Sequence, residues 1–147
     1  MPRTGDLLSL SREHHTALVL ARTALRAADA ADASETGGAR SNGPGLDAAV
    51  RSATAAMEAH WHAVMAAHFE QEERLIQLAG DALDAESAQR VMAEHSELRR
   101  LAAGPCDLEP VDRLRRFANL LRAHVRYEER AFFPQLQRLA SNGNTCE

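Results

Sequence analysis

The stretches HFEQEER (His68–Arg74) and HVRYEER (His124–Arg130) repeat one pattern, His-x-x-x-Glu-Glu-Arg, in two distant parts of the chain. A Glu-His pair precedes each of them, at 13–14 and at 94–95. The chain therefore carries the order EH, HxxxE, EH, HxxxE across four segments whose apolar residues recur at helical spacing. This order predicts a four-helix bundle in which every helix turns an imidazole, and two helices also a carboxylate, toward the core.

The composition favours an all-α fold in a single domain that covers residues 1–147. A chain of 147 residues has the usual length of one domain. Ala, Leu, Glu and Arg dominate, and all of them are good helix formers. Strand-favouring residues are sparse, with one Tyr and one Trp.

Apolar spacing and helix breakers predict helices over about 6–30, 46–79 and 82–103 and from about 109 onward. Gly80 is expected to end the second helix and Asp81 to cap the third. Pro134 is expected to kink or end the last helix. The Gly/Ser/Asn/Pro-rich stretch 31–45 predicts a mobile loop, and about 140–147 predicts a tail. Four helices with short outer connections predict an up-down-up-down bundle.

Charge and hydropathy argue against several classes of partner. The formal charge is −4 and there is no basic block, so nucleic-acid binding is not expected. No apolar run approaches the roughly 20 residues of a membrane span, and the N-terminus turns polar too soon for a secretory signal. Cys106 and Cys146 form no disulfide framework, so a cytoplasmic location is expected. The oligomeric state stays open, with a homodimer among the alternatives.

His68 lies in the middle of the apolar face of its helix. Trp61 and Leu75, each seven residues away, differ from it by only about 20° on a helix of 100° per residue. Glu72 lies one turn further on and stacks on the same face. His124 and its Glu128 repeat this arrangement.

The other two helices each place one histidine on a core-facing stripe. Together with the two His-Glu pairs this gives six inward ionisable residues: His14, His68, Glu72, His95, His124 and Glu128. Burying two unpaired carboxylates is costly, and a pair of cations removes that cost more completely than protonation does. Imidazole together with carboxylate suits iron, and also zinc or manganese. The pattern therefore predicts a shared metal site.

Simpler interpretations exist for each residue alone. A lone buried histidine is usually hydrogen-bonded to a neighbour, and a lone His-x-x-x-Glu pair is usually a solvated contact. The coincidence of such residues on four helices favours the metal site. His15 is the alternative ligand if the first helix is rotated.

Several other polar residues lie near the predicted ligands in the sequence. Surface positions are expected for His60 and His62, and Tyr127 is expected either to line the site or to pack. Glu73 and Glu129 are expected to face solvent or pair with arginine, whereas Glu13 and Glu94 either accept hydrogen bonds from the ligands or are solvated.

Four segments together resemble the hemerythrin-like, HHE cation-binding domain family: EHHTALVLA (13–21), HFEQEERLI (68–76), EHSELRRLA (94–102) and HVRYEERAFFPQL (124–136). The resemblance implies a four-helix bundle around a non-haem di-iron centre of the Fe–O–Fe type. It assigns as ligands His14, His68, Glu72, His95, His124 and Glu128. Among these, it implies that Glu72 and Glu128 bridge the two irons.

One position departs from the family's pattern. Oxygen-carrying hemerythrins place a second histidine one turn after the ligand of the third helix, and here that residue is Arg99. One nitrogen ligand is therefore missing unless His15, a water or another group replaces it. This argues against simple reversible oxygen carriage, and it opens a position for O2, peroxide or nitric oxide.

The expected function is that of a di-iron protein that binds or senses O2, NO or peroxide, or handles iron. Met57, Met65, Trp61 and Phe117 are expected to control access to the site. A sensor would need a separate signalling partner.

The second hypothesis is a metal-free or zinc-bound helical interaction module. The third is a peroxide- or oxygen-dependent di-iron enzyme, which ranks lower because the sequence shows no separate acid/base pair and no CxxC, HExxH, GxSxG or Gly-rich phosphate motif.

Overall fold

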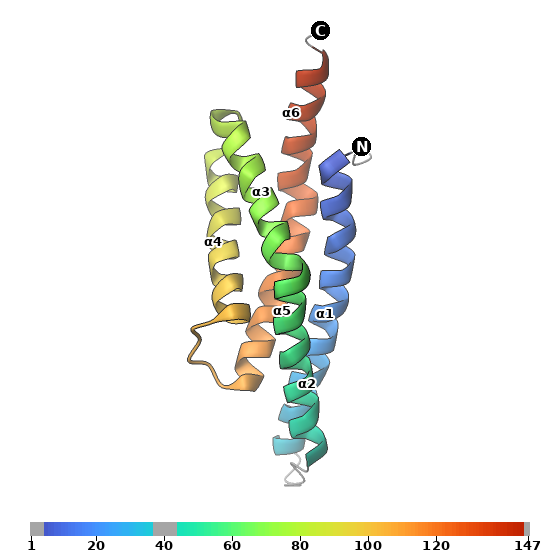
Figure 1. Cartoon of the computed structure of the whole chain (residues 1–147). Coiled ribbons are helices and arrows are strands. Elements are labelled where there is room, and N and C mark those ends of the chain that lie inside the picture. Colours follow the sequence, from blue (N-terminus) through green and yellow to red (C-terminus); the bar gives the residue numbers. More distant parts are fainter. Residues whose placement is uncertain (1–4, 37–43, 146–147) are drawn as a thin grey trace.

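A computed structural model describes residues 5–36 and 44–145 of the chain. Every regular element in these two ranges is helical (Figure 1), which confirms the predicted all-α class. The elements are α1 (Gly5–Thr36), α2 (Pro44–His60), η1 (Trp61–Met65), α3 (Ala66–Ala79), η2 (Gly80–Ala82), α4 (Ala85–Ala103), α5 (Pro110–Tyr127), η3 (Glu128–Phe132) and α6 (Phe133–Thr145).

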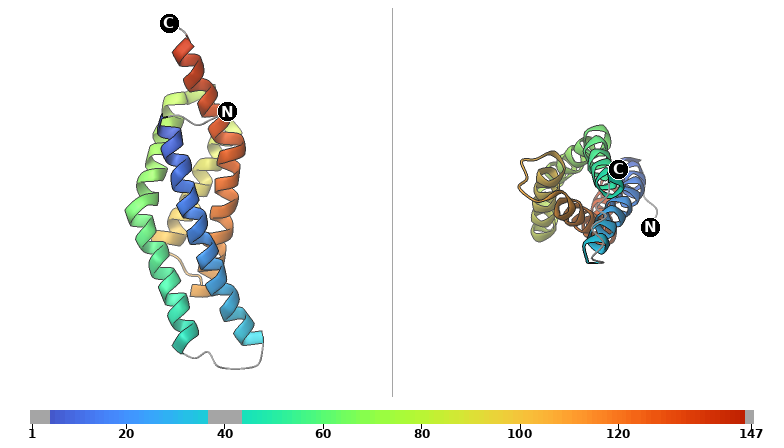
Figure 2. Two further views of the ribbon diagram at one scale, coloured as in Figure 1. Left: turned by 90° about the vertical axis from the view of Figure 1, so that its right-hand side faces the viewer. Right: turned by 90° about the horizontal axis from the view of Figure 1, so that it is seen from below.

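These elements form four long rods. The segments α2, η1 and α3 follow one another without a break, and so do α5, η3 and α6. The rods surround a common axis when the molecule is viewed from below (Figure 2), and α6 extends beyond the other rods at the end where both termini lie. None of the described helices combines the length and the low polarity needed to cross a bilayer.

The turn between α3 and α4 is one 3-10 turn longer than the sequence predicts. Gly80 ends α3 as expected, with a φ of 52° that glycine adopts readily. The helix cap is Asp84, whose side chain accepts a hydrogen bond from the Ser87 amide at 3.0 Å. The prediction of Asp81 as the cap is wrong. Leu83 is 5% exposed, and the extra turn places this side chain in the core before α4 begins.

The loop predicted over 31–45 is helical at both ends. Helix α1 continues to Thr36, and α2 begins at Pro44, while residues 37–43 lie outside the described residues. Arg115 on α5 contributes to the longer α1, because it pairs with Asp29 at 3.3 Å and with Asp32 at 2.6 Å. Helical order thus extends into a stretch whose composition resembles a loop.

Pro134 does not end the last rod, which continues to Thr145 through most of the predicted tail; residues 146–147 lie outside the described part. The π-helical turn η3 ends two residues before this proline, and the Phe133 amide donates a hydrogen bond to the carbonyl of Glu128, five residues back. A wider turn relieves the clash between a proline ring and the preceding carbonyl groups. The helix therefore continues beyond Pro134.

The core consists of two apolar clusters. The larger one contains Met57, Trp61, Met65 and Phe117, and the smaller one contains Phe132 and its neighbours. Most residues predicted to face inward are buried. Apolar spacing in the sequence also predicts inward positions for Leu18 and Met92, and this prediction is wrong, since the two residues are 39% and 40% exposed.

Candidate metal centre

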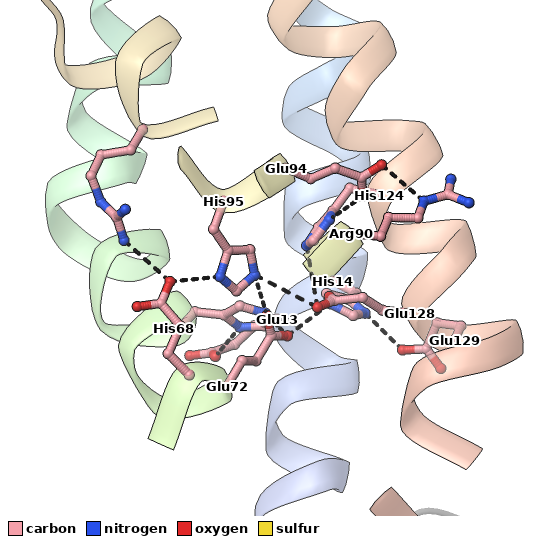
Figure 3. Close-up of polar contacts among 12 residues, drawn as sticks. Glu13, His14, His68, Glu72, Arg90, Glu94, His95, His124, Glu128 and Glu129 are labelled. Atoms are coloured by element: carbon pink, nitrogen blue, oxygen red, sulfur yellow. Dashed lines mark hydrogen bonds and ion pairs between the residues drawn. The ribbon is translucent and has the colours of Figure 1, made fainter. Parts of the chain in front are cut away.

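All six predicted ligands meet in the core of the bundle (Figure 3). They come from all four rods: His14 from α1, His68 and Glu72 from α3, His95 from α4, His124 from the end of α5 and Glu128 from the start of η3. Each is at most 2% exposed. The spacing in the sequence thus places six ionisable groups in the interior.

The six residues form two overlapping groups. One contains His14 and His68 and the other His95 and His124, while Glu72 and Glu128 belong to both. In each group the candidate donor atoms lie within 4.8 Å of one another. Each group therefore offers two imidazole nitrogens and two carboxylate oxygens, and the two carboxylates lie where they can be shared.

Two of the inner contacts are aligned as hydrogen bonds. Nε2 of His14 lies 2.8 Å from Oε1 of Glu128, and Nε2 of His95 lies 2.8 Å from Oε1 of Glu72. Each joins two different rods. The inner nitrogens thus face the shared carboxylates across the bundle.

The other two inner contacts are close but not aligned. Nε2 of His68 lies 2.8 Å from Oε2 of Glu72, and Nε2 of His124 lies 3.2 Å from Oε2 of Glu128. None of these four buried atoms has a hydrogen-bond partner among the described residues. Buried polar atoms without partners are rare and costly. One cation in each group would satisfy these four atoms, so the residues present fit a pair of metal ions.

Four further carboxylates bind the outer nitrogens of the same imidazoles. Every Nδ1 has a glutamate oxygen within hydrogen-bond distance, and in every pair the two residues come from different rods (Figure 3). The pairs are His14 with Glu129 at 2.7 Å, His68 with Glu13 at 2.8 Å, His95 with Glu73 at 2.8 Å, and His124 with Glu94 at 2.7 Å. The contacts form a closed ring that links each rod to the next.

This ring determines the tautomer of a neutral imidazole. An ionised carboxylate can only accept a hydrogen bond, so each Nδ1 must carry the proton that it donates. The lone pair of a neutral ring then lies on Nε2, which faces the centre of the bundle. All four histidines are therefore oriented as ligands, with the second nitrogen held by a carboxylate, as in most protein metal sites.

The electrostatics of the metal-free centre reflect the same contacts. Burial lowers the pKa of His14, His95 and His124, but the neighbouring carboxylates outweigh this effect. They raise the pKa of His14 to about 11 and that of His95 to about 9, and the pKa of His124 is also raised. Burial raises the pKa of Glu72 and Glu128, but the histidines outweigh it and hold both values below the ordinary one. Without metal, the centre is thus a network of imidazolium and carboxylate groups.

Aromatic rings cover the two halves of the centre. Phe69 stacks on His95 with 3.9 Å between ring centroids and an angle of 9°, and Phe133 stacks on His14 at 5.1 Å and 12°. Sequence reasoning did not identify Phe69 as a site residue. The feature that could have identified Phe69 is its position next to His68, on the side of the helix that faces α4.

Each rod that carries an HxxxE motif also contains a π-helical turn beside it. The turn η1 ends three residues before His68, and η3 begins at Glu128. A π-turn shifts the register of the residues beyond it, and such turns are frequent at functional sites. The regular helical spacing used on the sequence does not reveal them.

Several neighbouring residues depart from their expected positions. Glu73 and Glu129 are both members of the ring, and Glu73 also pairs with Arg99 at 3.4 Å. His60 was expected at the surface, but it is half-buried, and its two ring nitrogens have no partner among the described residues. Burial lowers its pKa. His15 is exposed, so it does not replace His14.

The remaining predictions for this region concern Tyr127 and His62. Tyr127 packs beside the smaller apolar cluster, donates a hydrogen bond to Ser87 Oγ at 2.8 Å and lies under the Arg90 guanidinium. His62 is exposed, as expected.

The chain has no significant match to a protein-family model, a curated protein or a solved structure.

Proposed function

We propose that this chain is a non-haem di-iron protein, with the up-down-up-down bundle of the hemerythrin-like type, that binds or senses O2, NO or peroxide, or handles iron. The observation that carries the proposal is the pair of buried groups that share Glu72 and Glu128. Each group adds two histidines whose Nδ1 atoms are held by further carboxylates. Two carboxylates shared between two pairs of imidazoles form a donor set that suits a pair of metal cations.

The donor chemistry favours iron. Both groups offer nitrogen and oxygen and no sulfur, which suits iron, and also zinc or manganese. Four carboxylates around the imidazoles add negative charge and make the ring nitrogens stronger donors. A more negative environment stabilises the higher oxidation state of a metal, which supports a redox-active ion.

The residues leave room for a small ligand. Two imidazoles and two carboxylates would hold each metal ion, fewer donors than a six-coordinate iron takes. Iron bound there would supply open coordination positions at which O2, NO or peroxide binds. Phe69 and Phe133, together with the apolar clusters on either side, keep bulk water from the donor atoms.

Arg99 supports ligand binding over simple oxygen carriage. It occupies the position where the oxygen-carrying proteins that the sequence resembles have a fifth histidine. Its side chain is 43% exposed, pairs with Glu73 and lies 5.8 Å from the Trp61 ring centroid. The guanidinium therefore stabilises the outer ring and supplies no nitrogen ligand, so this position stays open.

One observation favours a metal-free interaction module as the second candidate. His14 and His95 have carboxylate partners at both ring nitrogens, an arrangement that a protonated imidazole satisfies without metal. The Nε2 atoms of His68 and His124 argue against it, because they are buried and make no aligned hydrogen bond with the described residues. The two candidates differ in metal content, which can be measured directly.

The test is the metal content of untagged protein purified without oxygen. Two irons per chain, one for each group, would support the proposal. Zinc or manganese at the same occupancy would retain the site and exclude the redox function. A stable, folded chain without metal, unchanged after incubation with ferrous iron, would overturn it. Iron-loaded protein is then exposed separately to O2, NO and peroxide, and changes in its near-ultraviolet and visible absorption identify the ligand.

A further inference from the structure

A second group of charged residues lies on the outer face between α1 and α5. Four arginines, two from each helix, line a cavity of about 510 Å³: Arg22, Arg26, Arg122 and Arg126. All four side chains are exposed, and no hydrogen bond or ion pair joins them to the residues that the structure describes. The chain as a whole is negative, with a formal charge of −4, so this cavity concentrates positive charge.

The acidic residues of the cavity are engaged with other partners. Asp29 pairs with Arg115 at 3.3 Å, outside the lining. Glu129 accepts hydrogen bonds from His14 at 2.7 Å and from Ser11 at 2.8 Å through the same oxygen. With four arginines against these two carboxylates, the lining has a formal excess of two positive charges. The arginines are therefore available to an anion from solution.

The arrangement of the arginines is unfavourable without such an anion. Arg22 and Arg26 are four residues apart on α1, and Arg122 and Arg126 are four residues apart on α5. Like charges at this spacing face each other on a helix and destabilise it. Two such pairs also line the same cavity. An anion with more than one negative group would offset the repulsion within and between the pairs.

The lining also shows what kind of anion fits. Guanidinium groups bind phosphate and carboxylate with two parallel hydrogen bonds. Between the arginines lie apolar side chains: Leu18, which is 39% exposed, the partly buried Leu25, and Val125. These apolar side chains can contact the hydrocarbon part of an organic ligand. The volume is that of a small-molecule site.

We propose that this cavity binds a small organic anion that carries phosphate or carboxylate groups. A ligand seated beside Glu129 lies one hydrogen bond from His14 and so contacts the outer ring of the metal centre. The binding itself requires no metal and does not depend on the function proposed above. An absence of iron would therefore leave this inference intact.

The experiment measures binding of two probes to the full-length chain by calorimetry at low salt. Phenyl phosphate represents a phosphate ester with an apolar body, and propane-1,2,3-tricarboxylate represents a polycarboxylate; the tighter probe identifies the chemistry. Phenol, which lacks the charge, is expected not to bind. Affinity is expected to fall as salt rises, because the contacts are between exposed charges.

The variant Arg122→Gln/Arg126→Gln is expected to bind the tighter probe about tenfold or more weakly. The matched control is Arg74→Gln/Arg138→Gln, which removes the same charge from exposed positions outside the cavity and should bind like the wild type. Equal weakening in both variants, or no binding of either probe to the wild type, would overturn the inference. So would binding of an RNA or DNA oligomer through the same arginines when neither probe binds.

Discussion

The Glu73 carboxylate lies 2.8 Å from Nδ1 of His95, while the adjacent Glu72 approaches Nε2 of the same ring at 2.8 Å. Two consecutive residues of α3 thus hold both ends of one histidine on α4. Glu128 and Glu129 hold the two ends of His14 in the same way, at 2.8 and 2.7 Å. The repeated Glu-Glu pair of the HxxxEE motif therefore has a structural explanation: its first carboxylate faces the centre and its second orients a histidine on another rod.

Replacing the second carboxylate should weaken the metal site without removing a ligand. Glu73→Gln keeps the size of the side chain and an acceptor oxygen but loses the charge that fixes the tautomer of His95. Loss of such a partner typically costs about 10–100-fold in metal affinity. Affinity is measured by competition with a chromophoric chelator. Glu70→Gln, on the exposed side of the same helix, is the control and should not differ from the wild type. Equal affinity of all three proteins would contradict a role for the ring.

The shared carboxylate and a single histidine should differ in the number of metals that they affect. Glu128 belongs to both groups, so Glu128→Ala should empty both positions. His68 belongs to one group only, so His68→Ala should lose the first metal and keep a fraction of the second. Both variants should also have a lower melting temperature, because metal binding stabilises the folded state. Metal analysis per chain after gel filtration gives the answer. Unchanged metal content in both variants would exclude this site.

The spacing of apolar residues in the sequence is sufficient to predict the four rods and the inward direction of the six ionisable residues. His68, for example, has Trp61 and Leu75 on the same stripe, and its burial follows from them. The function of Glu73 could not be predicted in this way. It lies about 100° from Glu72 around the helix, which suggests solvent, but that edge of α3 faces His95. A helical wheel describes one helix and contains no information about its neighbours.

The two π-turns and the last turns of α1 were missed for a related reason. In η1 and η3 the register changes over a few residues, and the apolar spacing on either side still fits a regular helix. The end of α1 has a loop-like composition, but Arg115 of a distant helix pairs with it. Tertiary contacts override local preference at such positions.

The metal-free protein should lose stability in alkali. The folded-state pKa of His95 is about 9 and that of His14 about 11, both above the ordinary 6.5. A raised folded pKa contributes stability that is fully present below about 6.5 and is lost as the pH rises through the folded value. The melting temperature of chelator-stripped protein should therefore fall between about pH 7 and pH 11. Metal-loaded protein should not show this fall, because metal-bound imidazoles have already lost the proton.

Proton release on metal binding provides an independent measurement of the same linkage. At pH 7.5 the protons on His14 and His95 must leave before the metal can bind. Addition of metal to weakly buffered, stripped protein should acidify the solution, as a pH indicator would show. The Glu128→Ala variant, mixed with the same metal, provides the control. A melting temperature independent of pH together with no release of protons would contradict the imidazolium network.

The Phe69 ring should contribute to stability through its stacking on His95. It is 1% exposed and lies parallel to the imidazole, with 3.9 Å between the ring centroids. Removing a buried phenyl ring leaves a cavity and usually costs about 3–5 kcal/mol. Urea unfolding of Phe69→Ala should show a loss of this size in the free energy of unfolding. Leu78→Ala is the control, because Leu78 is 83% exposed and its loss should change that free energy by less than about 0.5 kcal/mol. Similar midpoints for the two variants would show that the phenyl ring does not support the centre.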